Sequence, residues 1–284
     1  MGDSTLRVGA HVSIADGLDA AVDQQADYGG TCGQLFVGSP RTWSVSTREP
    51  EEVTAFKQAT AEADIGPWII HGTYLINFAT PKDDLAAKSL DTVQAELDAA
   101  AELGIDYYTF HPGSHTGAGV DAGIDNVGTR LRELDVPDSV TVLLENTAGG
   151  GTSLGASMAE LGRMLDVAEL PSETLGVCLD TCHLYAAGYD FTTEAGMAEL
   201  RDEIDAEIGR ERVKYLHLND SKHPRGSHKD EHAHIGLGKI GDAGFEQLLA
   251  DKWLRSLPMA LETPVEDGKD YAWNIKRIRE LADD

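Results

Sequence analysis

A strand-like segment followed by a helix-like segment occurs eight times along this chain, and this repeat sets the strongest limit on its fold. The strand-like runs cover residues 6–13, 32–38, 67–74, 106–113, 140–146, 175–183, 213–220 and 258–264. The runs with helical periodicity cover residues 17–29, 50–65, 84–104, 122–134, 157–170, 196–209, 241–253 and 271–284. Strands that are apolar on both faces are typical of a parallel sheet covered by helices, and eight such units favour a closed barrel. We therefore predict an α/β fold of the (β/α)8 TIM barrel type, with residues 1–284 as a single domain. A doubly wound open sheet is the alternative.

The chain is strongly acidic. Its 49 Asp and Glu residues outnumber 23 Lys and Arg residues and give a formal net charge of −26, and the acids are spread over the whole length. Such a surface repels nucleic acid on average. In about 1 M salt, however, the Debye length falls to about 3 Å, so that a dense acidic surface is tolerated. The composition is therefore also explained by a halophile as the source, with a salt-rich cytoplasm.

Targeting signals and thiol motifs are missing from the sequence. The start, "MGDSTLRVGAHVS", has neither a basic region nor a long apolar one, and no run reaches the roughly 18 apolar residues of a membrane helix. Cys32, Cys178 and Cys182 are odd in number and form no CxxC pair, so we expect reduced thiols, with Cys178 and Cys182 as small core residues. We predict a cytoplasmic protein without membrane contact. No GxGxxG follows the first strand, which argues against a dinucleotide site.

Residue types that bind metals close six consecutive strand-like runs or follow them. These residues are His71, His111, Glu145, Asp180, His183, His217, Asp230, His232 and Glu262. Because parallel strands of a barrel end on one rim, we predict an active site on that rim, at the carboxyl ends of the strands. Any one of these residues could instead cap a helix or satisfy a backbone group. Their coincidence in consecutive units favours a shared site.

The number and type of donors indicate the kind of metal site. One zinc ion takes three or four protein ligands, so nine donors suggest two or three ions with a bridging carboxylate. Histidine and carboxylate without thiolate fit zinc or manganese, and five histidines favour zinc over magnesium. Such clusters generate hydroxide near neutral pH and hold phosphate oxygens. Phosphoester hydrolysis is the predicted chemistry.

Several motifs of the chain resemble those of the endonuclease IV family of apurinic/apyrimidinic endonucleases. In order they are "FHPGSH", "LLENTAGGG", "CLDTCHLYAAGYD", "HLNDSK", "KDEHAHIGLG" and "LETP", and the resemblance runs from about residue 7 to residue 264. It implies a barrel that carries three Zn²⁺ ions per chain, with Mn²⁺ as an alternative. It also implies base excision repair of double-stranded DNA, by cleavage 5′ to an abasic site that leaves a 3′-hydroxyl and a 5′-deoxyribose phosphate. We expect a monomer that requires no protein partner.

The resemblance also implies roles for individual residues. Glu145 and Glu262 would be catalytic, and Glu145 would bridge the first two metal ions, between which a hydroxide would act as the nucleophile. The third ion would stabilise the leaving oxygen. The implied ligand sets are His71, His111 and Glu145 for the first ion, Glu145, Asp180, His217 and Glu262 for the second, and His183, Asp230 and His232 for the third.

Further residues are implied to contact DNA. Arg41, Tyr74 and Leu75 match positions where the family inserts side chains at the lesion, which fits the modest cost of extruding a nucleotide that has no base pair. Glu231 departs from the family, which usually has Arg there, and this puts a phosphate contact in doubt. Less specific predictions are that His115 or His11 supports the site, that Asn146 and Asn219 orient loops, and that Arg41, Lys222, Arg225 and Lys229 form a locally basic patch.

Two other functions remain open at this point. Metal-dependent sugar isomerases and epimerases use the same barrel type with one or two ions, and they would not need Asp230 and His232. A lesion-binding protein without catalytic activity would bind abasic DNA and leave it intact. The metal content and the products formed would distinguish these classes.

Overall fold

The eight strands of the main sheet form a closed parallel barrel in the computed structural model, which describes residues 6–283. In chain order the strands are β1 (Val8–His11), β2 (Gly33–Leu35), β3 (Trp68–His71), β4 (Tyr107–Phe110), β5 (Thr141–Glu145), β6 (Leu175–Asp180), β7 (Val213–His217) and β10 (Met259–Leu261). Neighbouring strands pair in parallel all the way round, and β1 closes the barrel on β10. The predicted (β/α)8 barrel is confirmed, and the doubly wound alternative is wrong.

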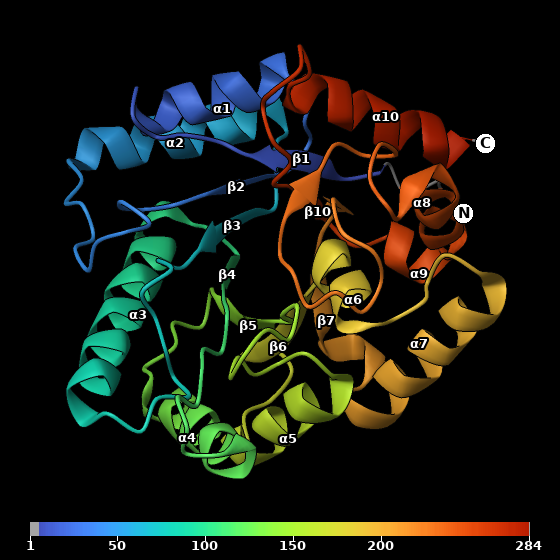
Figure 1. The fold of residues 1–284 in the computed structure, drawn as a ribbon. Helices are drawn as coiled ribbons and strands as arrows, with labels where there is room; N and C mark the ends of the chain where they lie inside the picture. The colour runs from blue at the N-terminus through green and yellow to red at the C-terminus, as the bar shows by residue number, and fades with distance from the viewer. Residues whose placement is uncertain (1–5, 284) are drawn as a thin grey trace.

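Helices surround the strands as an outer ring (Figure 1). The ring helices are α1 (Leu18–Asp27), α2 (Pro50–Ala63), α3 (Asp83–Leu103), α4 (Val120–Glu133), α5 (Met158–Ala168), α7 (Glu194–Glu207), α8 (Gly241–Ala250) and α10 (Tyr271–Asp283). Their ends follow local chemistry. For example, the Ser157 hydroxyl accepts a hydrogen bond from the Glu160 amide at the start of α5, and Gly104 ends α3 with φ of 70°.

Short elements at the strand ends depart from the predicted ranges. The sixth strand stops at Asp180, and residues 181–183 belong to helix α6 (Thr181–Ala187), so His183 lies on a helix and not at a strand end. Asp180 causes this because its Oδ1 accepts a hydrogen bond from the His183 amide at 2.8 Å and caps the helix. Figure 1 shows α6 near the centre of the ring.

The segment after β7 carries an antiparallel pair that was not predicted. This pair consists of β8 (Asp220–Ser221) and β9 (His232–Ala233). The seventh predicted helical run, residues 241–253, is divided, because α8 ends at Ala250 and a separate short helix, α9 (Lys252–Arg255), follows it. A 3₁₀ turn (Arg210–Arg212) precedes β7.

The barrel interior is closed by an apolar layer directly below the predicted ligands. This buried cluster consists of Ile69, Leu143, Cys178, Tyr215 and Ala260, and it is separate from the larger core between the strands and the helices. Each member lies two residues before a predicted ligand that ends the same strand or directly follows it. Because side chains alternate along a strand, residues two apart point the same way. The predicted ligands therefore point into the barrel one level above an apolar floor.

All three cysteines are buried and unpaired, as expected from the sequence. Cys178 belongs to the apolar floor, and burial raises its pKa to about 11. Between residues 6 and 283, no helix combines the length and the apolar character needed to cross a membrane.

A buried acid supports the β3 end of the barrel. Glu96 of α3 is 4% exposed, and its Oε2 accepts a hydrogen bond from the Tyr108 hydroxyl at 2.7 Å. Burial raises the pKa of Glu96 to about 7, although hydrogen bonds from Tyr108 and the Thr73 amide oppose this rise. The folded protein therefore holds this proton more tightly than the unfolded chain does.

This proton makes stability depend on pH in a defined direction. Protonated Glu96 contributes fully to the free energy of unfolding below about pH 4.5, its pKa in the unfolded chain. This contribution is lost as the pH rises through about 7, its pKa in the folded protein. Ionising it costs about 3 kcal/mol of unfolding free energy at pH 8. We expect Glu96→Gln to gain stability relative to the parent between pH 5 and pH 8, measured by denaturant unfolding. Glu102→Gln, an exposed change on the same helix, should show no such trend; an equal trend in both variants would rule out Glu96 as the source.

Candidate metal centre

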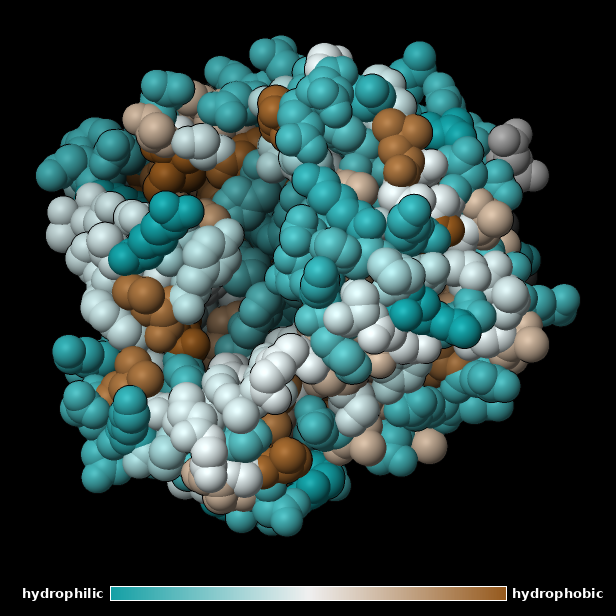
Figure 2. All heavy atoms as spheres, viewed as in Figure 1, coloured by the Kyte–Doolittle hydropathy of each residue, from teal (hydrophilic) through white to brown (hydrophobic). Residues whose placement is uncertain are grey.

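The nine predicted ligands lie together at the carboxyl end of the barrel. His71, Glu145, Asp180 and His217 are the last residues of their strands, and His111 and Glu262 directly follow β4 and β10. His183 comes from α6, and Asp230 and His232 come from the segment that ends in β9. Several of them line a cavity of about 520 Å³. Figure 2 shows a hydrophilic hollow near the centre of this face.

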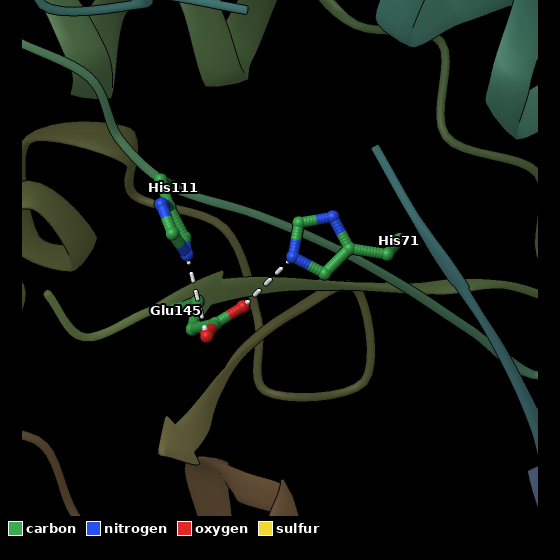
Figure 3. A group of neighbouring side chains, drawn as sticks. All are labelled: His71, His111 and Glu145. Atoms are coloured by element: carbon green, nitrogen blue, oxygen red, sulfur yellow. Dashed lines mark ion pairs between the residues drawn. The ribbon is translucent and has the colours of Figure 1, made fainter. Parts of the chain in front are cut away.

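The first group joins β3, β4 and β5. His71 Nε2 lies 3.3 Å from Glu145 Oε2, and His111 Nε2 lies 3.3 Å from Glu145 Oε1. Figure 3 shows both rings pointing at the two oxygens of one carboxylate. The ligand atoms of these three residues lie within 4.8 Å of one another, a spacing that could hold one metal ion.

The second group shares Glu145 with the first. Its members are Glu145, Asp180, His217 and Glu262, whose ligand atoms also lie within 4.8 Å of one another. His217 Nδ1 lies 3.1 Å from Glu145 Oε1 and 3.7 Å from Glu262 Oε2. A fully buried carboxylate common to both groups has the position needed to bridge two cations.

The third group lies on the α6 side of the cavity. Asp230 places Oδ2 3.1 Å from His183 Nε2 and Oδ1 3.1 Å from His232 Nε2. The Asp230 side chain is 48% exposed, whereas Glu145 is fully buried. This group therefore opens toward solvent, and the other two lie deeper.

Backbone carbonyl groups fix three of the imidazole rings. Nδ1 of His71 lies 2.8 Å from the Gly72 oxygen, Nδ1 of His183 lies 2.9 Å from the Asn146 oxygen, and Nδ1 of His232 lies 3.1 Å from the Glu262 oxygen. Since a carbonyl oxygen only accepts, each Nδ1 is the protonated nitrogen. The Nε2 lone pair then faces the carboxylates, as in a metal ligand whose other nitrogen is held by hydrogen bonding.

Buried atoms without hydrogen-bond partners converge on the same space. Both carboxylate oxygens of Glu145, Nδ1 of His217 and Nε2 of His232 are buried and make no hydrogen bond. Leaving such atoms unsatisfied is costly, and a bound cation removes that cost. Five imidazoles and four carboxylates without thiolate fit zinc or manganese. The residues present therefore suit a cluster of divalent metal ions.

The electrostatics favour positive charge in this space. Burial lowers the pKa of His183, but the charges of Asp180 and Asp230 outweigh it and raise that pKa well above the usual range. Burial raises the pKa of Glu145, but His217 and His111 outweigh it and hold that pKa well below the usual range. Glu145 thus stays ionised and attracts cations.

Cys182 is an alternative donor near the third group. Its sulfur could form a set with Asp180 and His232. However, burial raises the pKa of Cys182 to about 12, and its thiol donates to the Glu231 carbonyl oxygen at 3.8 Å. Only a thiolate binds metal well, so Cys182 is a small core residue here.

One of the residues predicted to contact DNA, Tyr74, lines the cavity. Tyr74 is 63% exposed, and its ring meets Phe36 edge to face with centroids 5.4 Å apart. Leu75 is half-buried beside it, and Arg41 is exposed. The Tyr74 amide donates to the Pro40 oxygen at 3.0 Å, which joins the loop of Tyr74 to the loop of Arg41.

The predicted basic patch is weaker than its sequence suggests. Lys222 lies 3.3 Å from Glu266, and Arg225 forms an ion pair with Asp190. Glu231, the residue that departs from the family, lies 3.0 Å from His223. Acidic partners therefore neutralise much of the local positive charge.

Three amide side chains support the ligands. Asn146 Oδ1 accepts from the Asp180 amide at 2.6 Å, and Asn219 Nδ2 donates to Asp180 Oδ2 at 2.6 Å. Asn146 holds the backbone of Asp180, which agrees with its predicted role in orienting a loop, and Asn219 contacts both the Glu262 backbone and the Asp180 side chain. Gln34 of β2 was not predicted, although it contacts both His217 and Glu262. Its only signal in the sequence is a polar residue at an inward position of the apolar run "CGQLFVG".

The two supporting histidines differ in their roles. His11 lies 4.0 Å from Glu262 and lines the cavity. His115 Nδ1 accepts hydrogen bonds from the Gly117 and Gly119 amides, so it stabilises its own loop.

Comparison with known proteins identifies similar proteins over nearly the whole chain. Residues 22–281 match a family described as "Xylose isomerase-like TIM barrel". A protein of Natronomonas pharaonis named "Probable endonuclease 4" is 53% identical over 97% of this chain and 98% of its own length. Its namesake in Halobacterium salinarum is 51% identical, over 97% of this chain and 99% of its own length. The crystal structure of endonuclease IV from Thermus thermophilus superposes with a TM-score of 0.85 at 38% identity, over 98% of this chain and 99% of that one.

Proposed function

This chain belongs to the endonuclease IV family of xylose isomerase-like TIM barrels, and we propose that the three groups at its barrel rim hold the metal ions of the reaction. It is an apurinic/apyrimidinic endonuclease, a hydrolase of base excision repair. The bond hydrolysed is the DNA phosphodiester on the 5′ side of an abasic site. Its halophilic relatives fit the dense acidic charge of −26.

The observation that carries the proposed site is the sharing of Glu145. Its two oxygens face His71 and His111 on one side, and Oε1 also faces His217 on the other. A carboxylate so placed bridges two cations, and the third group lies beside them. We therefore propose three Zn²⁺ ions per chain, with Mn²⁺ as the alternative occupant.

Each group of side chains has a distinct part in this proposal. Bound cations would supply hydroxide near neutral pH and stabilise charge on the phosphate and leaving oxygens. Glu145 and Glu262 are the proposed catalytic carboxylates because both face Nδ1 of His217, at 3.1 Å and 3.7 Å. Asp230, half-exposed, places the third group at the entrance, where the leaving oxygen of a DNA strand would lie.

Contact with DNA is proposed to depend on few side chains. Tyr74 and Leu75 would enter the duplex at the lesion, and Arg41 on the adjoining loop would approach the phosphates. Such binding would release few counterions and would tolerate salt better than that of a basic protein.

The sugar isomerase alternative fits the site less well. That chemistry needs one or two ions, whereas His183, Asp230 and His232 form a complete third group. The xylose isomerase-like description of the family therefore applies to the fold.

The state of the protein in the cell follows from two further proposals. One chain supplies all nine candidate ligands, so we propose that the enzyme acts as a monomer on double-stranded DNA. Its three buried free thiols fit a reducing cytoplasm.

One experiment tests the proposed function directly. The purified protein is analysed for metal by mass spectrometry and incubated with a duplex that carries one abasic site, from low salt to molar salt. We expect three zinc ions per chain, a single nick 5′ to the lesion and loss of nicking after chelation. An undamaged duplex is the control. One manganese ion per chain with turnover of a ketose would support the isomerase instead, and a steep loss of nicking with salt would contradict the proposed DNA contacts.

A further inference from the structure

Gln34 occupies the ligand layer of the barrel without being a candidate ligand. It is fully buried on β2, and its register places it beside His11 of β1 and Ile69 of β3. Its side-chain nitrogen lies 2.6 Å from Glu262 Oε1 and 2.8 Å from His11 Nδ1. Its side-chain oxygen lies 2.6 Å from His217 Nε2. One neutral amide thus contacts two of the four residues in the second group.

Only one orientation of this amide satisfies its neighbours. An ionised carboxylate accepts hydrogen bonds and cannot donate, so the Gln34 nitrogen must face Glu262. The Gln34 oxygen then faces His217, which must donate from Nε2. The flipped amide would place its oxygen against a carboxylate oxygen, with repulsion and a lost hydrogen bond. The contacts therefore fix the orientation.

The orientation of Gln34 decides which His217 nitrogen is free. With the proton on Nε2, the lone pair of His217 is on Nδ1. This nitrogen is buried without a hydrogen-bond partner and lies 3.1 Å from Glu145 Oε1. His217 thus presents Nδ1, whereas His71 and His232 present Nε2.

The group that holds the imidazole ring in place also differs between His217 and three of the other histidines. Backbone oxygens hold His71, His183 and His232, and no substitution removes a backbone oxygen. His217 depends on a side chain from another strand. The contribution of Gln34 can therefore be tested by mutation.

We infer that Gln34 is a positioning residue that selects the Nδ1 lone pair of His217 and holds Glu262, so that both point at the second metal ion. This inference rests on the proposed metal centre and deepens it. Gln34 acts through these two ligands and has no proposed contact with the substrate. Partners that hold a metal-bound imidazole commonly change metal affinity by about 10- to 100-fold when they are removed.

The test compares Gln34→Met with the parent and with Gln94→Met. Methionine keeps the length of the side chain and removes its hydrogen bonds, and Gln94 is a half-buried glutamine of α3 away from the site. Zinc affinity is measured by competition with a chelator, and the Co²⁺-loaded proteins are compared by absorption. We expect Gln34→Met to weaken at least one zinc site by about 10- to 100-fold and to change the cobalt spectrum. Gln94→Met should match the parent in both.

A role confined to packing predicts a different pattern. Gln34→Met would then lower the melting temperature of the metal-free protein while zinc affinity and the cobalt spectrum stayed at the parental values, and this result would overturn the inference. Should that variant not fold, Gln34→Leu removes the same hydrogen bonds with a shorter apolar side chain. Weaker zinc binding by Gln34→Leu supports the inference, and parental affinity overturns it.

Failure of the proposed function gives a separate result. A parent that binds zinc without nicking abasic DNA would overturn the nuclease, while the difference in zinc affinity would still decide the role of Gln34. A parent with no affinity for zinc or manganese would overturn both.

Discussion

Replacing Glu145 by glutamine is expected to lower the rate of abasic-site cleavage by about 10³-fold or more, equivalent to about 4 kcal/mol of transition-state stabilisation. The residue is fully buried, and its two oxygens face His71, His111 and His217 within 3.1–3.3 Å. Glutamine has the same shape but carries no charge, and its NH₂ group cannot coordinate a metal ion. One substitution therefore disturbs both deep groups.

Metal content and cleavage rate should change together in this variant. We expect metal analysis to show loss of one or two zinc ions per chain, and single-turnover nicking to show the loss of rate. Glu199→Gln, an exposed change on α7, is the matched control and should retain both. Parental zinc content with a parental rate in Glu145→Gln would remove Glu145 from the proposed bridge.

The site residues on the strands were predictable because two simple rules apply to them. Strands of a parallel barrel end on one rim, and inward side chains recur every second residue. His71, Glu145, Asp180 and His217 satisfy both rules, since each ends a strand two residues beyond a member of the apolar floor. The closure of β1 on β10 agrees with the predicted barrel.

The remaining features depend on local contacts that no periodicity reveals. His183 was expected at a strand end, but capping by Asp180 starts a helix there. The β8–β9 pair was missed because two-residue strands give no sequence pattern. Gln34 was missed because its role depends on contacts with residues 183 and 228 positions away in the chain.

The acidic surface and the metal centre have a common electrostatic consequence. A net charge of −26 attracts cations to the whole surface, and the carboxylates of the cavity concentrate that attraction at one place. Molar salt screens the surface charge over about 3 Å but affects a buried group such as Glu145 much less. Salt should therefore weaken DNA repulsion at the surface and leave the metal groups intact.

The third group can be tested apart from the other two through Asp230. Its carboxylate contacts His183 and His232, each at 3.1 Å. We expect Asp230→Asn to lose one zinc ion of three and to cleave abasic DNA about 10²- to 10³-fold more slowly, a loss of about 3–4 kcal/mol. Metal analysis and single-turnover nicking measure both effects, with Asp202→Asn of α7 as the exposed control.

A modified substrate can show whether the third group stabilises the leaving oxygen. If the bridging 3′-oxygen is replaced by sulfur, the leaving group is a thiolate, which needs far less stabilisation because a thiol has a pKa of about 8.5 and water one of about 15.7. The defect of Asp230→Asn should then shrink to less than about 10-fold, since the lost stabilisation is no longer required. An equal defect on both substrates would mean that the third group positions the DNA and does not act on the leaving atom. Because Asp230 is half-exposed at the entrance, while Glu145 is buried, the two variants separate the entrance of the site from its deep part.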